Sequence, residues 1–245
     1  MKLTVLGKNG PFPRAGGACS GYLLESGDVR LVLDMGNGTL SRLLQACGLE
    51  RISAVLLSHL HSDHMSDMLI LRYALAQLRA RGKDVPMPLS VITPSEPEAE
   101  FRQLASFGVY DMTLAEDGMR LRFGDLSVTL HRMIHPVPSF AFSITDGEKR
   151  FFYTGDTAYF PQLAELCEGH DLLLADSGLL SSDKTTMVAA HMTAKEVGEI
   201  ARDARVKRLL CTHIWGGYQD DEVLAEAKEA FPEAEVAHEG ETYEI

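Results

Sequence analysis

Apolar residues occur along the chain with two spacings, one typical of strands and one typical of helices. Short apolar or alternating runs predict strands at residues 2–6, 19–25, 29–34, 52–57, 89–92, 119–123, 126–133, 140–145, 151–154, 172–175 and 207–211. Helical spacing of apolar residues predicts helices at residues 38–47, 65–81, 94–107, 159–167, 194–204 and 221–231. Two sheets packed face to face, with helices outside, satisfy this order. The pattern indicates a mixed α/β protein and does not fix its topology.

Composition narrows the class of protein. The 245 residues are 45% hydrophobic and no linker divides them, so we expect a single domain over residues 1–245. The net charge of −12 disfavours long nucleic acid as a partner, because such binders gain most of their affinity from Lys and Arg. The four cysteines lack paired spacing, which favours reduced thiols. With no signal sequence or membrane-length apolar run, we expect a cytoplasmic protein without a membrane partner.

The clearest chemical signal is segment 58–64, Ser-His-Leu-His-Ser-Asp-His, which follows the predicted buried strand 52–57. His59 and His61 are two residues apart, so in extended backbone their side chains point the same way and can bind one metal ion. Asp63 and His64, in the following turn, can serve a second ion, because imidazole and carboxylate are both common metal ligands. The alternative, a solvated histidine-rich loop, is disfavoured by this spacing.

This segment resembles the His-x-His-x-Asp-His signature of the metallo-β-lactamase superfamily, and weaker motifs follow in that family's order. The resemblance implies a four-layer αββα sandwich of two mixed β-sheets with outer helices. It also implies a site for two metal ions, with the ligands His59, His61, Asp63, His64, His135, Asp156 and His213. Asp156 would bridge the two ions, and Asp34 would brace the metal loop without binding metal.

Two divalent ions lower the pKa of a shared water to near neutrality and so supply a hydroxide nucleophile. We expect Zn²⁺, while Mn²⁺ and Fe²⁺ accept the same ligands. Such a site can open a β-lactam, a thioester, a lactone or a phosphodiester, so the metals alone do not select the substrate. The carboxylate of Asp156 argues against true β-lactamases, which resemble this family but lack it.

Segment 190–196, Ala-His-Met-Thr-Ala-Lys-Glu, resembles the His-x-Thr motif of the ribonuclease Z-like phosphodiesterases. The resemblance implies that His191 is the general acid that protonates the leaving alkoxide and that Asp176 orients it. Asp63 is the third residue expected to be catalytic. The chemistry is sound without the family, because an alkoxide leaving group needs an acid and an imidazole can serve. The alternative is that His191 only caps its helix near Thr193.

Ribonuclease Z carries a long arm that grips transfer RNA, inserted between the third ligand and the bridging carboxylate. Here a short hairpin over residues 140–154 joins His135 to Asp156, so a small or generic phosphodiester is the expected substrate and transfer RNA is not. The leading prediction is therefore a dinuclear phosphodiesterase of the small, armless kind. A hydrolase of thioesters, lactones or other carboxylic esters is the second, and a catalytically silent metal-binding protein is the third. Related phosphodiesterases often form dimers, so the resemblance allows a homodimer.

Four further residues are expected near the substrate. Arg14, in a loop rich in Gly and Pro, could pair with a phosphate oxygen. Ser139 belongs to a His-x-x-Pro-Ser segment that resembles the same phosphodiesterases. Trp215 and Tyr218 follow His213 and could form one wall of the pocket. The simpler alternatives are an ordinary surface loop for Arg14 and a packing role for Trp215.

Overall fold

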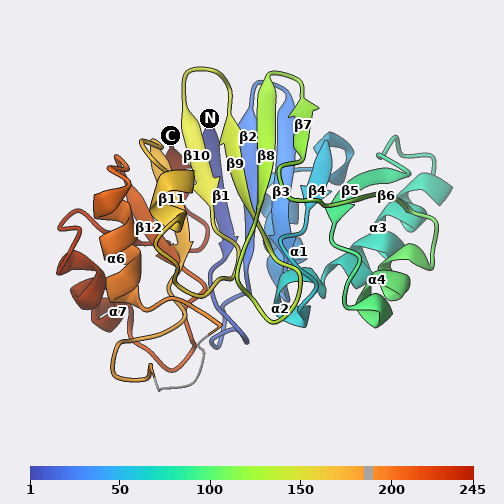
Figure 1. Ribbon diagram of the computed structural model, residues 1–245. Coiled ribbons are helices and arrows are strands. Elements are labelled where there is room, and N and C mark those ends of the chain that lie inside the picture. The colour runs from blue at the N-terminus through green and yellow to red at the C-terminus, as the bar shows by residue number, and fades with distance from the viewer. Residues whose placement is uncertain (185–189) are drawn as a thin grey trace.

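Two seven-stranded sheets form the middle of the protein in the computed structural model, which describes residues 1–184 and 190–245 (Figure 1). The first sheet has the order β14-β1-β2-β3-β4-β5-β6, and the second has the order β13-β12-β11-β10-β9-β8-β7. The strands of the first sheet are β1 (Lys2–Gly7), β2 (Gly21–Ser26), β3 (Val29–Met35), β4 (Ala54–Leu56), β5 (Leu89–Thr93), β6 (Tyr110–Leu114) and β14 (Thr242–Glu244). Those of the second are β7 (Arg120–Phe123), β8 (Leu126–Arg132), β9 (Phe140–Thr145), β10 (Arg150–Tyr153), β11 (Leu172–Asp176), β12 (Leu209–Thr212) and β13 (Glu235–Val236).

The two sheets have the same internal plan. From β14 to β3 the neighbours are antiparallel, and from β3 to β6 they are parallel. From β7 to β10 the neighbours are again antiparallel, and from β10 to β13 they are parallel. Both sheets are therefore mixed, as the resemblance implied.

Helices cover the outer face of each sheet. They are α1 (Thr39–Ala46), α2 (Ser62–Met65), α3 (Met68–Ala80), α4 (Glu98–Ala105), α5 (Leu163–Leu166), α6 (Ala194–Asp203) and α7 (Asp220–Lys228), with one 3₁₀ turn, η1 (Leu49–Arg51). Apolar residues of α1 to α4 pack on the first sheet, and those of α5 to α7 pack on the second. Figure 1 shows α3 and α4 on one side of the sheets and α6 and α7 on the other. This arrangement confirms the predicted αββα sandwich.

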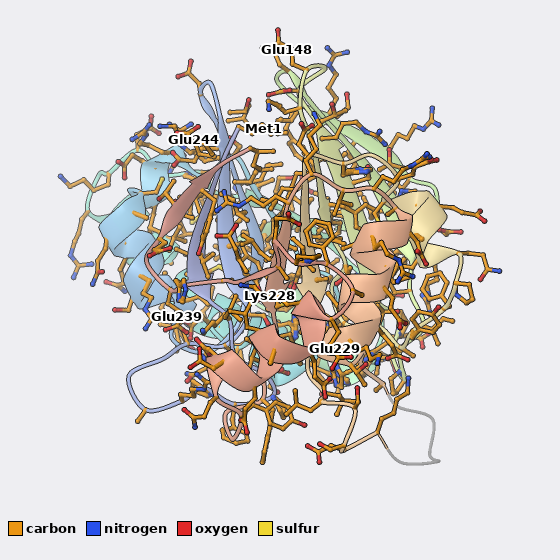
Figure 2. All side chains as sticks on the ribbon, turned by 90° about the vertical axis from the view of Figure 1, so that its left-hand side faces the viewer. Met1, Glu148, Lys228, Glu229, Glu239 and Glu244 are labelled. Atoms are coloured by element: carbon orange, nitrogen blue, oxygen red, sulfur yellow. The ribbon has the colours of Figure 1, made fainter. Side chains whose placement is uncertain are left out.

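The central core lies between the sheets. Large side chains such as Tyr22 from the first sheet and Phe142 and Tyr153 from the second are buried there. The ends of the described chain meet at one edge, since β14 pairs with β1 and Lys2 lies opposite Glu244. Figure 2 shows Met1 and Glu244 close together. None of the described helices is long and apolar enough to cross a membrane.

The structure changes several predicted elements. The predicted helix 65–81 begins three residues later, as α3, and the short helix α2 precedes it. The predicted helix 159–167 shrinks to the single turn of α5. The strands β6, β13 and β14 were not predicted. They lie at or beside sheet edges, and β6 is half exposed, so their sequences lack the continuous apolar runs of a buried strand.

His170 allows a test of this fold that does not involve the site. Its side chain is fully buried, beside Phe152 and within hydrogen-bonding distance of the Ser143 hydroxyl, 2.9 Å away. Burial, reinforced by the positive charge of Arg150, lowers the pKa of His170 from 6.5 to about 4. The unfolded chain therefore binds a proton that the folded one rejects, and this stabilisation is present above pH 6.5 and is lost as the pH falls toward 4.

We expect His170→Gln to flatten the fall in the free energy of unfolding between pH 6.5 and 4, by at most about 1.4 kcal/mol per pH unit. Urea denaturation at a series of pH values measures this. The matched control is His238→Gln, at an exposed histidine. Equal pH slopes for the wild type and His170→Gln would refute the assignment.

Candidate metal centre

Four chemically important side chains of the second sheet lie at or just after the ends of strands that run in the same direction. His135 comes shortly after β8, Asp156 after β10, and His213 directly after β12, while Asp176 is the last residue of β11. β10, β11 and β12 are parallel to one another, and β8 is parallel to β10 because both are antiparallel to β9. The carboxyl ends of all four strands therefore lie at one edge of the sheet, where open α/β sheets place their ligand sites.

The first sheet supplies the remaining groups from two neighbouring parallel strands. Asp34 is near the end of β3, and segment 58–64 follows β4. His61 has extended backbone dihedrals and immediately precedes the short helix α2, which contains Asp63 and His64. The local structure thus has the form that the spacing predicted, with extended residues followed by a turn.

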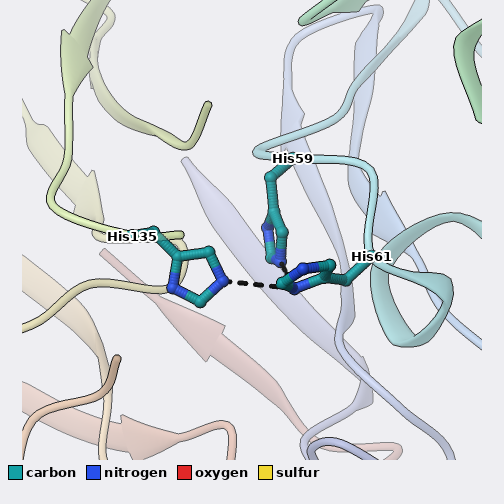
Figure 3. Close-up of side chains that lie close together, drawn as sticks. All are labelled: His59, His61 and His135. Carbon is teal, nitrogen blue, oxygen red and sulfur yellow. Dashed lines mark hydrogen bonds between the residues drawn. The ribbon is translucent and has the colours of Figure 1, made fainter. Parts of the chain in front are cut away.

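Three imidazoles form the first cluster. His59 Nε2 lies 3.0 Å from His61 Nδ1, and His135 Nε2 lies 3.1 Å from the same atom. Figure 3 shows the three rings turned toward one another, those of His59 and His61 from one loop and that of His135 from another. Their ligand atoms lie within 4.8 Å of one another.

The hydrogen bonds around this cluster fix which ring nitrogens carry lone pairs. His135 Nδ1 must carry its proton, because it lies 3.1 Å from the carbonyl oxygen of Ala190, which can only accept. The Ser58 hydroxyl donates to Asp34, so it accepts from His59 Nδ1. The Nε2 atoms of His59 and His135 therefore present lone pairs to His61. Burial is the largest effect on the three imidazoles and lowers the pKa of each, so they are neutral near pH 7 and able to bind a cation.

The second cluster combines two carboxylates with two imidazoles: Asp63, His64, Asp156 and His213. His213 Nε2 lies 3.2 Å from an oxygen of Asp63 and 3.2 Å from an oxygen of Asp156. His64 Nε2 lies 3.3 Å from the other oxygen of Asp156. The four groups come from both sheets and surround one point.

Asp156 lies between the two clusters. Its Oδ2 atom is 3.6 Å from His59 Nε2 in the first cluster and 3.2 Å from His213 Nε2 in the second. Its side chain is almost completely buried, at 2% exposure. This is the position that a carboxylate bridging two ions would occupy.

Two buried atoms that face each other support a fit to metal ions. Among the described residues, neither His64 Nε2 nor Asp156 Oδ1 has a hydrogen-bond partner, although both are buried and only 3.3 Å apart. Buried polar atoms without partners are uncommon and costly. A cation bound by both atoms would satisfy both, and the combination of imidazoles and carboxylates suits Zn²⁺, Mn²⁺ or Fe²⁺.

The charges of the second cluster favour a bound cation as well. Burial lowers the pKa of His64, but the carboxylates of Asp156, Asp34 and Asp63 raise it to about 10. Burial also lowers the pKa of His213, but the carboxylates of Asp156, Asp176 and Asp63 together raise it well above 6.5. Without metal, protons on these imidazoles compensate the buried carboxylates, and divalent ions would displace those protons.

Asp34 is a hydrogen-bond acceptor behind the cluster. Its carboxylate accepts from Ser58 N at 2.7 Å, Ser58 Oγ at 2.8 Å and Tyr153 Oη at 2.7 Å. It also lies 2.8 Å from His64 Nδ1, which leaves His64 Nε2 to face Asp156. The geometry agrees with the brace that the resemblance implied. Neither Ser58 nor Tyr153 was predicted, because within an apolar strand nothing distinguishes this tyrosine from an ordinary core residue.

His191 and Asp176 form a pair beside the second cluster. His191 Nδ1 lies 2.9 Å from Asp176 Oδ2, and the His191 ring stacks on His213 with ring centroids 4.9 Å apart. Asp176 is held in turn by the backbone N–H groups of Thr157 and Gly178. Burial lowers the pKa of His191, but the carboxylate of Asp176 outweighs it and the net pKa is above 6.5.

The helix after His191 has its own cap. Thr193 is the N-cap of α6, its hydroxyl accepts from Glu196 N at 3.2 Å, and the Glu196 carboxylate accepts from Thr193 N at 2.9 Å. This reciprocal capping box leaves no capping role for His191. The alternative interpretation of His191 as a helix cap is therefore wrong.

Two of the residues expected near the substrate are engaged elsewhere. Arg14 Nη1 donates to Asp220 at 2.7 Å, and Nη2 donates to the Tyr218 carbonyl, so the guanidinium is not directed at the metal ligands. Ser139 is fully buried, and its hydroxyl donates to the backbone carbonyl of Asp156 at 2.9 Å. Ser139 therefore holds the backbone of Asp156, and Arg14 holds the loop that contains Tyr218. Direct contact with substrate remains a prediction for each.

Trp215 and Tyr218 do line a cavity. It has a volume of about 360 Å³ and adjoins the second cluster; His213 and His191 form part of its wall, together with Gly178 and Leu179. Gly10 was expected in this region only as part of a glycine-rich loop. A Cβ atom on Gly10 would come within 2.0 Å of His213 Nε2, so only glycine leaves room for the imidazole.

Comparison with known proteins identifies the family. The Beta-lactamase superfamily domain matches residues 29–214, and the chain belongs to the metallo-β-lactamase superfamily. "Probable metallo-hydrolase YhfI" of Bacillus subtilis is 34% identical over 247 residues, covering all of both chains. The crystal structure of YhfI superposes with a TM-score of 0.93, covering 100% of this chain and 99% of that one.

More distant relatives share the fold. A ribonuclease Z of Archaeoglobus fulgidus is 25% identical, covering 100% of this chain and 98% of its own. The Zn²⁺-bound PqqB of Methylobacterium extorquens is 19% identical and superposes with a TM-score of 0.78 over all of both chains. At that identity the likeness shows the fold alone.

We expect Asp34→Asn to weaken metal binding about 10- to 100-fold, because the amide cannot accept every hydrogen bond that orients His64 and Ser58. Competition with a chromogenic chelator measures the affinity, and circular dichroism checks the fold. Asp171→Asn is the matched control, since Asp171 is also a buried carboxylate but pairs with Lys207 away from the clusters. Equal affinities for Asp34→Asn and the wild type would contradict the bracing role.

Proposed function

We propose that the chain is a dinuclear metal-dependent hydrolase that cleaves small phosphodiesters, with His191 as the general acid. Two clusters of ligands that share a buried carboxylate support the metal dependence. Two divalent ions, when bound, would lower the pKa of a water molecule and polarise the phosphate. The first cluster would hold one ion through His59, His61 and His135, and the second would hold the other.

The pairing of His191 with Asp176 carries the choice of phosphodiester. Asp176 accepts from His191 Nδ1, so the other ring nitrogen, Nε2, is available to carry a proton into the cavity that His191 lines. In the reaction, a hydroxide, formed when water loses one proton to solvent, forms a bond to phosphorus, and the bond from phosphorus to the leaving oxygen breaks. The proton of His191 Nε2 passes to that leaving oxygen, which departs as an alcohol.

The loops around the site favour a small substrate. Only a four-residue turn separates β9 from β10, between His135 and Asp156, which leaves no room there for an RNA-gripping arm. Arg14, the expected phosphate contact, is already paired with Asp220. The net charge of −12 also disfavours a long polyanion. We therefore place a small phosphodiester ahead of transfer RNA.

His191→Ala should distinguish a phosphodiester from an acyl substrate. With Zn²⁺ or Mn²⁺, we expect the variant to lose about 10²- to 10⁴-fold in kcat on a dinucleoside monophosphate, whose alkoxide leaving group needs a proton. The loss on bis-p-nitrophenyl phosphate should be much smaller, because p-nitrophenolate is already stable as an anion. Initial rates on both substrates, at equal metal content, give the comparison.

A matched variant separates acid catalysis from structure. Asp176→Asn keeps the shape of the residue but weakens its hydrogen bond to His191. We therefore expect this variant, too, to lose more kcat on the dinucleoside monophosphate than on bis-p-nitrophenyl phosphate. Equal losses on both substrates would exclude proton donation by His191. Rapid cleavage of a thioester or lactone, without turnover of either phosphodiester, would replace the proposal with an acyl hydrolase.

A further inference from the structure

The cavity next to His191 differs in character from the metal clusters. Its lining combines the polar side chains of His213, His191 and Asp183 with Trp215, Tyr218 and Leu179, and most of its lining surface is apolar. None of the described residues that line it is a lysine or an arginine. A group that leaves from the phosphate toward His191 would therefore meet apolar surface.

Trp215 is exposed on one face and fixed on the other. Its side chain is 41% exposed, although large aromatic side chains are usually buried. The ring packs edge-to-face on Tyr218, with ring centroids 5.0 Å apart and an interplanar angle of 74°. Tyr218 is only 6% exposed and is anchored through its hydroxyl, which donates to Asp183 and accepts from Leu180 N.

Gly217 holds the indole ring close to the backbone. A Cβ atom on Gly217 would lie 2.1 Å from a carbon of the Trp215 ring, so any other residue would push the ring away. Gly217 does not have a positive φ, so Gly217→Ala would act through the ring and not through backbone strain. The indole is thus held as a preformed surface beside the proposed acid.

We propose that Trp215, supported by Tyr218 and Gly217, forms a leaving-group subsite that binds one uncharged aromatic ring. The inference rests on the proposed function and narrows its substrate class. The cavity of about 360 Å³ is near the lower end of ligand pockets and suits a small ring. Asp183 also lines it, and this carboxylate disfavours leaving groups that carry further phosphates.

The sequence makes the subsite directly observable. Trp215 is the only tryptophan of the chain, so intrinsic fluorescence excited at the indole band reports on this wall alone. Phenylphosphonate and methylphosphonate present the same anionic head group to the site and differ in the ring. We expect phenylphosphonate to quench the fluorescence of the metal-loaded protein, to bind about tenfold more tightly than methylphosphonate, and to compete with bis-p-nitrophenyl phosphate.

Variants separate stacking from folding. Trp215→Ala and Gly217→Ala should each weaken phenylphosphonate binding about tenfold in calorimetric titration and leave methylphosphonate binding unchanged, while Trp215→Phe should restore much of the difference. Tyr73→Ala is the matched control, because Tyr73 is an exposed aromatic residue on α3 that does not line the cavity. It should bind both phosphonates as the wild type does.

The two proposals fail in different ways. If neither phosphodiester is turned over but phenylphosphonate still quenches Trp215 and binds more tightly than methylphosphonate, the subsite stands and the reaction is wrong. If turnover is observed but the two phosphonates bind equally, or Trp215→Ala weakens both alike, the aromatic subsite is refuted. Unchanged phenylphosphonate binding in Trp215→Ala would refute it as well.

Discussion

The convergence of buried imidazoles and carboxylates at close range is the constraint on which this structure depends. The hydrogen bonds of His59 and His135 direct the bare nitrogen of each ring at His61, about 3 Å away. The carboxylates of Asp63 and Asp156 converge in the same way on His64 and His213. Without metal, protons on His64 and His213 compensate these carboxylates, and divalent ions would displace those protons. The convergence of seven ligand groups in one place therefore supports bound cations.

The sandwich is arranged so that this convergence can occur. Each sheet places the ends of parallel strands at one edge, and the two sheets face each other across a core that contains Tyr22 and Tyr153. Tyr153 in the second sheet donates to Asp34 in the first, and Asp34 contacts His64. The packing of the sheets and the orientation of a metal-facing imidazole are thus linked through one carboxylate. A shift of one sheet against the other would move both clusters.

The sequence predicts the site better than its surroundings, and the reason is physical. Segment 58–64 carries four of the metal-facing groups within one strand end and turn, so local spacing alone implies their geometry. His135, Asp156 and His213 could be assigned only from the order of motifs in a family. Arg14 and Asp220 lie 206 positions apart, and no local pattern reveals that they pair. In the same way, the sequence alone indicates that Tyr153 is a core residue, and only the fold shows that its hydroxyl donates to Asp34.

The strand predictions show the same limit. Buried strands such as β3 and β11 have long apolar runs, and their bounds were predicted within a residue or two. The strands β6, β13 and β14 lack such runs and are defined by their hydrogen bonds to a neighbouring strand. Short edge strands have little sequence signal of their own. What determines them is a partner that is distant in the chain.

The most direct test of the central claim is anomalous diffraction from crystals of the protein grown with Zn²⁺ or Mn²⁺, recorded at the absorption edge of the metal. The account predicts two peaks, one about 2 Å from the nitrogens of His59, His61 and His135, and the other among Asp63, His64 and His213, with Asp156 between them. Crystals of metal-supplemented protein in which these positions show no anomalous density would contradict it.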